Sequence, residues 1–406
     1  MKSFWLLTGA TAISTTGNTF LYLAVPWALV SSTGSSLLAV LSLAAQTAPY
    51  LAAPLLGILI DRYDRRLLFA TGEVVQGVCV GLIPLLLAIH EIGMVFVALC
   101  VMGLAKVISD VAVGYSLIPA LVPMDRLDQA SSWFNSAQMG ARFAGPAVAG
   151  LTIAAVEPVW ALEIDAATFL ITTLTAFFMP PANNNGMGKK ARASIKASLR
   201  EGVAYFRSRP DLLRLTFAVA LYNLGAGALE PTLLTVGVDQ WHWSSAALGV
   251  AVSCGAVAAA LGAWLSPMVF AGNERRHIRI SAWLGVAGLG SLALLIRTPI
   301  AVVVGFCVLC LGEGGVNATT MAYRQHEIPS ELSGRVNAVI RMFIMGAVPV
   351  SALLLGLTVN LSGSLQVFFP VTVTAMLALL LWTIQGKRSE VEPTTRLMVV
   401  GEERSV

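Results

Sequence analysis

Six ionisable side chains interrupt long apolar stretches of the sequence and could carry the chemistry of this protein. They are the acids Asp110, Glu230 and Glu313 and the bases Lys106, Arg142 and Arg341. A carboxyl group surrounded by apolar side chains binds a proton more readily than one in water, so such a group can exchange protons near neutral pH. We interpret the acids as candidates for proton coupling, with Glu313 ranked ahead of Glu230 and Asp110. The bases are candidates for lining a substrate cavity.

Static ion pairs between helices are an equally open interpretation of each of these charges. Lys106 and Asp110 are four residues apart, a spacing that allows a direct pair on one helix face. Uncharged groups at similar depth, namely Asn18, Gln46 and Gln138, are further candidates for the cavity. For Asp165, near the end of another apolar stretch, we favour a structural role.

The elements that carry these residues are predicted to be membrane-spanning helices. The chain has 406 residues, of which 56% are hydrophobic and only 12% charged. Apolar stretches of about twenty residues recur throughout, and each can cross a hydrocarbon core of about 30 Å. We therefore predict an all-α polytopic membrane protein with twelve transmembrane helices.

The motif content argues against an enzyme, a cofactor and a metal site. The sequence contains neither H-E-x-x-H nor G-x-x-x-x-G-K-[ST], which are the patterns of zinc proteases and ATP-driven pumps. Cys307 and Cys310 form a C-x-x-C, but no second pair or nearby histidine completes a site, so we expect them to pack as small apolar residues. The net charge of +4 predicts no nucleic-acid partner, because the cations lie in loops.

The distribution of arginine and lysine predicts the orientation in the membrane. Alternate loops collect nearly all the cations, and such loops lie in the cytoplasm. Both termini fall on this side, so we expect a multi-pass protein of the cytoplasmic membrane. We expect it to work as a monomer in the lipid bilayer.

A long polar break near the middle of the chain predicts two halves of six helices each. We expect an N-terminal half at 1–180, a cytoplasmic linker at 181–210, a C-terminal half at 211–385 and a cytoplasmic tail at 386–406. The linker contains an amphipathic helix suited to the inner membrane surface. A faint repeat between the fifth and eleventh spans favours duplicated halves, which is a pattern of transporters.

The loop after the second span carries the charged sequence GILIDRYDRR at 57–66. Its spacing resembles G-x-x-x-D-R-x-G-R-[RK], the signature of the major facilitator superfamily. The matching residues are Gly57, Asp61, Arg62, Arg65 and Arg66, with Asp64 where the family has glycine. The resemblance implies a latch that joins the two halves on the cytoplasmic side in the outward-facing state. A merely solvated, positively charged loop is the alternative.

A second stretch, in the fifth span, resembles the G-P-x-x-G-G motif of exporters in that superfamily. Gly145, Pro146 and Gly150 match it, and Ala149 replaces one glycine. Small residues and proline let helices approach closely and bend, as a gate requires. Ordinary helix packing would explain the same residues. The stretches LEIDAATFLITTL and LREGVAYFRSRPDLLRL narrow the resemblance to the drug:proton antiporter-3 branch, which includes macrolide and siderophore exporters.

These observations favour a proton-coupled exporter of an amphipathic small molecule, such as a drug, an antibiotic or a siderophore. Its partners would be that substrate and protons, and it would work by alternating access. A metabolite importer and a lysolipid or lipid flippase with the same fold are alternatives. A membrane sensor or scaffold without transport is an alternative of another class.

Overall fold

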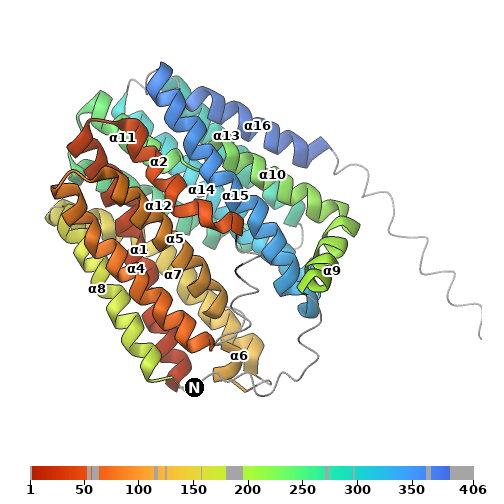
Figure 1. Cartoon of the computed structure of the whole chain (residues 1–406). Helices are drawn as coiled ribbons and strands as arrows, with labels where there is room; N and C mark the ends of the chain where they lie inside the picture. The colour runs from red at the N-terminus through yellow and green to blue at the C-terminus, as the bar shows by residue number, and fades with distance from the viewer. Residues whose placement is uncertain are drawn as a thin grey trace, which may run out of the picture.

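The computed structural model describes residues 2–52, 56, 64–113, 118–123, 126–156, 158–179, 195–269, 274–295, 298–362 and 367–384. The elements within these ranges are helices, and they fall into two groups joined through α9 (Figure 1). The N-terminal group contains α1 (Lys2–Thr33), α2 (Ser36–Thr47), the 3-10 helix η1 (Ala48–Ala52), α4 (Arg65–Ala88), α5 (Ile92–Ala112), α6 (Ile118–Leu121), α7 (Leu127–Ala155) and α8 (Pro158–Phe177). After α9 (Ile195–Ser208), the C-terminal group contains α10 (Pro210–Ala226), α11 (Leu229–Trp241), α12 (Ser245–Val269), α13 (Glu274–Leu295), α14 (Pro299–Glu327), α15 (Ser330–Ser362) and α16 (Phe368–Ile384).

Helices are the expected solution because backbone polar groups in lipid must be paired within the chain. Eight of the described helical stretches are long and apolar enough to cross a membrane. Two shorter apolar helices, Ser36–Ala52 and Phe368–Thr383, and the long helices α1 and α7, which are richer in small polar residues, are consistent with the remaining predicted spans. Large apolar side chains such as Leu294 and Phe369 are exposed on the outer faces, as lipid contact requires. The chain is a multi-pass α-helical membrane protein.

The first apolar stretch of the C-terminal half, 211–237, is not one continuous helix. It breaks at Gly227 and Ala228, between α10 and α11. The backbone N–H of Ala228 donates to Ser351 Oγ of α15 at 3.2 Å, so a side chain satisfies a group that the break leaves free. Pro231 lies in the first turn of α11, where its missing N–H costs no helical hydrogen bond.

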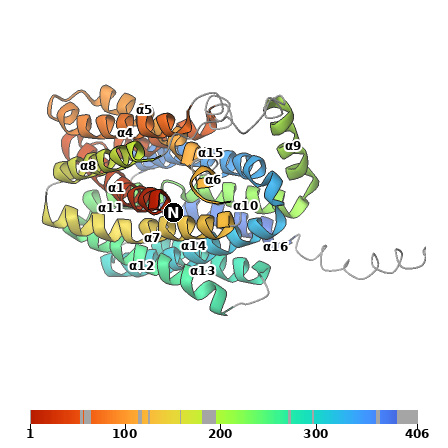
Figure 2. The same ribbon diagram turned by 90° about the horizontal axis from the view of Figure 1, so that it is seen from below.

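Buried cores join the two groups at the outer end, which is the end opposite to the N-terminus and α9. Leu234, Leu248 and Val252 of the C-terminal group belong to a core made mainly by α1, α4, α5, α7 and α8. Val40 and Leu43 of α2 belong in turn to the main core of the C-terminal group. Seen from the inner end, α7 lies beside α12 (Figure 2).

The cores at the inner end stay within one group each, as far as the described residues show. Phe4, Phe69 and Ala176 belong to a core of the N-terminal group alone. Leu212 and Ile340 belong to another, formed by α9 and the C-terminal group. The start of α1 and the start of α15 lie apart in Figure 1. The structure therefore shows a closed outer end and inner ends with separate cores.

Helix α9 forms within the predicted amphipathic segment, and the apolar side chains described in its C-terminal half contact protein, while its place at the membrane surface stays a prediction. Phe206 is buried in a core with α10 and α15, and its ring stacks on Phe343 at 6.2 Å. Tyr205 Oη donates to the backbone carbonyl of Glu327 at 2.6 Å. Sequence periodicity shows that one side is apolar but cannot show what covers that side.

Candidate functional site

Among the described residues, an ion pair links α5 of the N-terminal group to α15 of the C-terminal group. Arg341 Nη2 donates to Asp110 Oδ2 at 2.8 Å. Tyr50 of η1 donates its hydroxyl to the same oxygen at 3.0 Å, and its ring lies 5.0 Å from the Arg341 guanidinium carbon. The two charged side chains are 41% and 29% exposed, so the pair is accessible. An accessible pair that joins two groups of helices can break when these groups separate.

The other two predicted bases, Lys106 and Arg142, lie near this pair. Lys106 lies one helical turn before Asp110 on α5, and both Lys106 and Arg142 are close enough to act electrostatically on Asp110. The ion partner of Asp110 in the described part of the chain is Arg341 and not Lys106, so the direct i, i+4 pair that the spacing allows is not formed. Arg142 of α7 is exposed. The structure thus brings these four predicted charges into one cluster.

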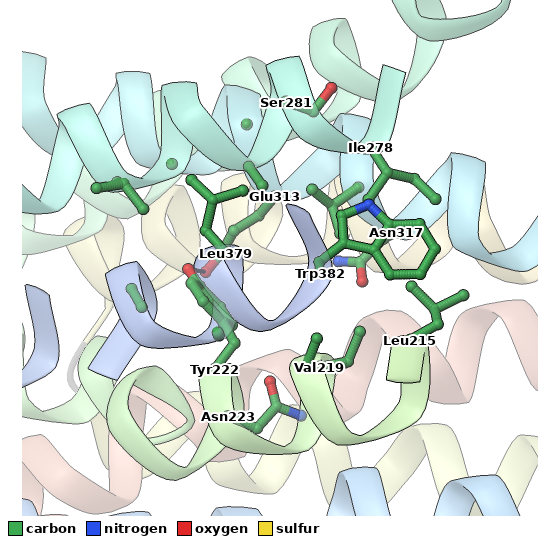
Figure 3. Close-up of a pocket in the computed structure, with 18 residues that line it drawn as sticks. Leu215, Val219, Tyr222, Asn223, Ile278, Ser281, Glu313, Asn317, Leu379 and Trp382 are labelled. Carbon is green, nitrogen blue, oxygen red and sulfur yellow. Dashed lines mark hydrogen bonds between the residues drawn. The ribbon is translucent and has the colours of Figure 1, made fainter. Parts of the chain in front are cut away.

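The first-ranked acid, Glu313, lines a cavity inside the C-terminal group. The cavity has a volume of about 150 Å³ and lies between α10, α13, α14 and α16 (Figure 3). Tyr222 of α10 points toward Glu313 and donates a hydrogen bond to its Oε1. Asn223 and Asn317 add amide groups to a lining that is otherwise mostly apolar. Such a mixture suits a proton site or the polar end of a small amphipathic molecule.

Glu230 lies in the first turn of α11, directly after the helix break. Its carboxyl group is close enough to that of Glu313 for the two charges to interact. Like charges in a shared low-dielectric region disfavour simultaneous ionisation. The first two acids in our ranking therefore act on each other, whereas Asp110 belongs to the cluster between the groups.

The predicted uncharged cavity residues bond within the N-terminal group. Asn18 and Gln46 are buried, and their amide nitrogens donate to the carbonyls of Ser14 and Ser42 on their own helices at 2.8 and 3.2 Å. Gln138 of α7 bonds to two threonines of α1, accepting from one hydroxyl at 2.5 Å and donating to the other at 2.8 Å. These contacts support helix packing, so their part in a substrate cavity stays a prediction.

The glycine motif of α7 makes two close approaches. A Cβ atom at Gly145 would meet the side chain of Thr19 on α1 at 2.6 Å. One at Gly150 would collide with the backbone of Gly249 on α12, which belongs to the other group of helices. Pro146 lies between them inside α7. The predicted close approach is present, and its use as a gate remains a prediction.

Only part of the predicted latch can be placed. Gly57, Asp61 and Arg62 lie outside the described residues, as does the side chain of Arg65, so the latch stays a prediction. Asp64 is the N-cap of α4, and its Oδ1 accepts from the backbone N–H of Arg66 at 2.9 Å. Arg66 in turn donates to the carbonyl of Phe177, at the end of α8, at 2.7 Å.

We expect Asp64→Ala to destabilise the folded protein by about 1 kcal/mol, the usual cost of losing an N-cap. Asp64→Asn should keep the cap and most of the stability. Thermal unfolding of the purified variants in one detergent measures the difference. Equal melting temperatures for Asp64→Ala and the wild type would contradict a capping role.

Sequence reasoning did not single out three residues that the structure brings to these sites. Tyr50 and Tyr222 supply the hydroxyl groups that hold Asp110 and Glu313. Their signal in the sequence is weak, because a tyrosine in an apolar span says only that its hydroxyl needs a partner. The third residue, Glu73, is an acid within an apolar span and belongs to a buried cluster described below. It lies only about two helical turns after the charged residues at the start of α4, so the sequence does not separate it from that charged segment.

Comparison with known proteins identifies relatives along most of the chain. The family model described as Major Facilitator Superfamily matches residues 7–352. Macrolide efflux protein A of Streptococcus pyogenes is 22% identical over 86% of this chain and 88% of its own length. Multidrug efflux pump Tap of Mycobacterium tuberculosis (strain ATCC 25618 / H37Rv) is 24% identical over 92% of both. Among solved structures, a bacterial homologue of the iron transporter ferroportin in its inward-facing state has a TM-score of 0.69 at 16% identity, covering 94% of this chain and 98% of that one.

Proposed function

The chain belongs to the Major Facilitator Superfamily, and we propose that it is a proton-coupled exporter of amphipathic small molecules in the cytoplasmic membrane. The observation that carries this proposal is the similarity to two efflux pumps, which extends over 86% of this chain in one case and 92% in the other. The proposed activity is transport and not catalysis, and the proposed unit is a monomer.

The packing of the helices supports alternating access as the mechanism. The outer end is held by shared cores and by the Gly150–Gly249 approach, whereas Asp110 and Arg341 join the groups further inward. A second state would open the outer end and bring the inner ends together. We assign the loop at 57–66 to the inner contact of that state.

The C-terminal cavity supports proton coupling. Glu313 accepts a hydrogen bond from one neutral donor, Tyr222, in a mostly apolar cavity, and its charge acts on a second carboxyl group, that of Glu230. A proton bound here neutralises one acid and so changes the charge of the cavity. Substrate and proton can then compete for the same charge, which is the requirement for antiport.

The test of the proposed function is transport by proteoliposomes under an imposed pH gradient. The panel contains a macrolide, a lipophilic organic cation and a siderophore, with empty liposomes and an added protonophore as controls. We expect movement of at least one compound against its gradient, and collapse of this movement with the protonophore. Ligand binding without flux would identify a sensor, and accelerated movement of a labelled lipid without these compounds would identify a flippase.

We expect Glu313→Gln, and to a smaller extent Glu230→Gln, to lower proton-driven accumulation by about 5- to 150-fold, the usual range of a coupling energy. An amide cannot release a proton, so the gradient no longer drives transport, whereas exchange of substrate across the membrane without a gradient should persist. Glu91→Gln, which changes an exposed acid outside the apolar spans, is the control. Full accumulation by both variants would refute this assignment.

A further inference from the structure

A second buried acidic cluster lies inside the N-terminal group, away from the interface between the groups. Its members are Glu73 of α4, which is 4% exposed, and Asp165 of α8, which is 0% exposed. Both face the same stretch of α1. Ser14 bonds to Glu73, and Gly17, one turn further along α1, contacts Asp165.

The hydrogen-bond donors to these carboxyl groups are neutral. Ser14 Oγ donates to one oxygen of Glu73 at 3.4 Å, and Gln76 Nε2 donates to the other at 3.2 Å. Thr168 Oγ1 donates to Asp165 Oδ1 at 3.4 Å. The second oxygen of Asp165 is buried without a hydrogen-bond partner among the described residues. A fully buried carboxylate oxygen with no hydrogen-bond partner is rare, and a proton bound to the carboxyl group would lower the cost of burying it.

The charged groups around the cluster do not balance it. Lys106 of α5 is a cation that acts on both Glu73 and Asp165, the two acids act on each other, and Asp110 of α5 adds a further negative charge near Glu73. The side of α1 that faces them carries no charge in this stretch, and the nearby Glu163 of α8 is exposed. Among the described residues, the ammonium group of Lys106 is thus shared by Glu73, Asp165 and Asp110, and Asp110 is paired with Arg341 as well. Burying an ionised carboxylate without a paired cation costs several kcal/mol.

We propose that Glu73 and Asp165 form a proton-binding site inside the N-terminal group, and that the site holds at least one proton in the state seen here. A proton on either acid supplies the missing positive charge. A proton on Asp165 would also turn its carboxylate into a hydrogen-bond donor. A proton fits this site better than a metal ion, because no group of three or more His, Cys, Asp or Glu side chains that could hold a metal occurs among the described residues.

This site goes beyond the proposed coupling acids, which lie in the C-terminal group. It is connected to the contact between the groups, because the Nε2 atom of Gln76 also lies 3.3 Å from Ser109 Oγ, to which it donates. Ser109 directly precedes Asp110 on α5. Lys106 acts on Asp110 as well as on both buried acids. Loss of the proton adds a negative charge close to Lys106, and this charge partly cancels the effect of Lys106 on Asp110. The strength of the Asp110–Arg341 pair changes as a result.

Infrared spectroscopy of the purified full chain in lipid nanodiscs tests the proposal without any substrate, so its result is independent of what the protein exports. Protonated carboxyl groups absorb apart from ionised ones. At neutral pH we expect the protonated-carboxyl band to lose the intensity of at least one group in the double variant Glu73→Gln/Asp165→Asn, and in the single variant of whichever acid holds the proton. If Asp165→Asn does not fold, the band is titrated with pH in the wild type and in Glu73→Gln, and removal of the neighbouring acid must either abolish the band of the site or shift its midpoint.

Glu163→Gln is the matched control, because it removes an exposed acid of the same helix two residues from Asp165. It should leave the band unchanged. Glu313→Gln serves as a second control. Any protonated-carboxyl intensity that it removes belongs to the C-terminal cavity, so this loss must add to the loss caused by Glu73→Gln. A protonated-carboxyl band of equal intensity in the wild type and in the folded double variant would overturn the proposal, as would an unchanged titration of the band in Glu73→Gln.

Discussion

Transport by the Asp110→Asn variant is expected to fall by about tenfold or more relative to the wild type. The substitution removes the charge that holds Arg341 across the two groups of helices, at a 2.8 Å contact. A hydrogen bond to a charged group contributes about 1.5–3 kcal/mol, and a tenfold change in an equilibrium corresponds to about 1.4 kcal/mol. The pair is partly exposed, so we place the effect at the lower end of this range. Initial rates of substrate uptake into inverted vesicles measure it.

The matching variants separate an ion pair from a proton site. If Asp110 acts through Arg341, then Arg341→Gln should be impaired to a similar degree, and the double variant should be no worse than either single change. If Asp110 instead carries the transported proton, Asp110→Asn alone should lose coupling to the pH gradient. Glu91→Gln is the control, since it removes an exposed acid outside the apolar spans. Additive losses in the double variant would contradict the paired role.

The fold class could be read from the sequence because hydrophobicity alone determines which stretches cross a bilayer. The helix break at Gly227 was harder to foresee, since its free N–H is satisfied by Ser351, which lies 123 residues away along the chain. The same limit applied to α9, whose apolar side was evident while its partner, α15, was not. Periodicity describes one helix, and contacts between distant helices follow from how all of them pack.

The candidate site shows the same difference between features of one helix, which the sequence reveals, and contacts between helices, which it does not. Charged residues at membrane depth stand out in any apolar sequence, which is why Asp110, Arg341 and Glu313 could be singled out. Sequence spacing allowed Lys106 as a partner of Asp110, because spacing can pair only neighbours on one helix. The actual partner, Arg341, comes from the other group of helices. Glu73 was obscured by the charged residues at the start of its own helix.

A second substitution with a large expected effect concerns the contact between Gly150 and Gly249, which closes the outer end. Gly150 of α7 and Gly249 of α12 approach so closely that a Cβ atom on either would overlap the backbone of the other. A backbone cannot rotate away as a side chain can, so the two helices must separate to accommodate even a methyl group. Overpacking of this kind costs about 1–3 kcal/mol. Because the contact joins the two groups, this cost falls on the outward-closed state and not on the fold of either group.

We therefore expect Gly150→Ala to shift the protein toward a state with an open outer end, by about 5- to 150-fold in population. Spin labels at Trp160→Cys and His242→Cys, two exposed positions of the N-terminal and C-terminal groups, report this opening as a longer distance. The labelled protein must lack its five native cysteines. Gly140→Ala is the matched control on the same helix, since a Cβ atom there meets nothing within 4 Å.

Transport should fall in Gly150→Ala, because a carrier held in one state cannot complete its cycle, and stay normal in Gly140→Ala. An unchanged distance distribution together with normal transport in Gly150→Ala would show that the glycine contact is ordinary packing and that the outer seal lies elsewhere.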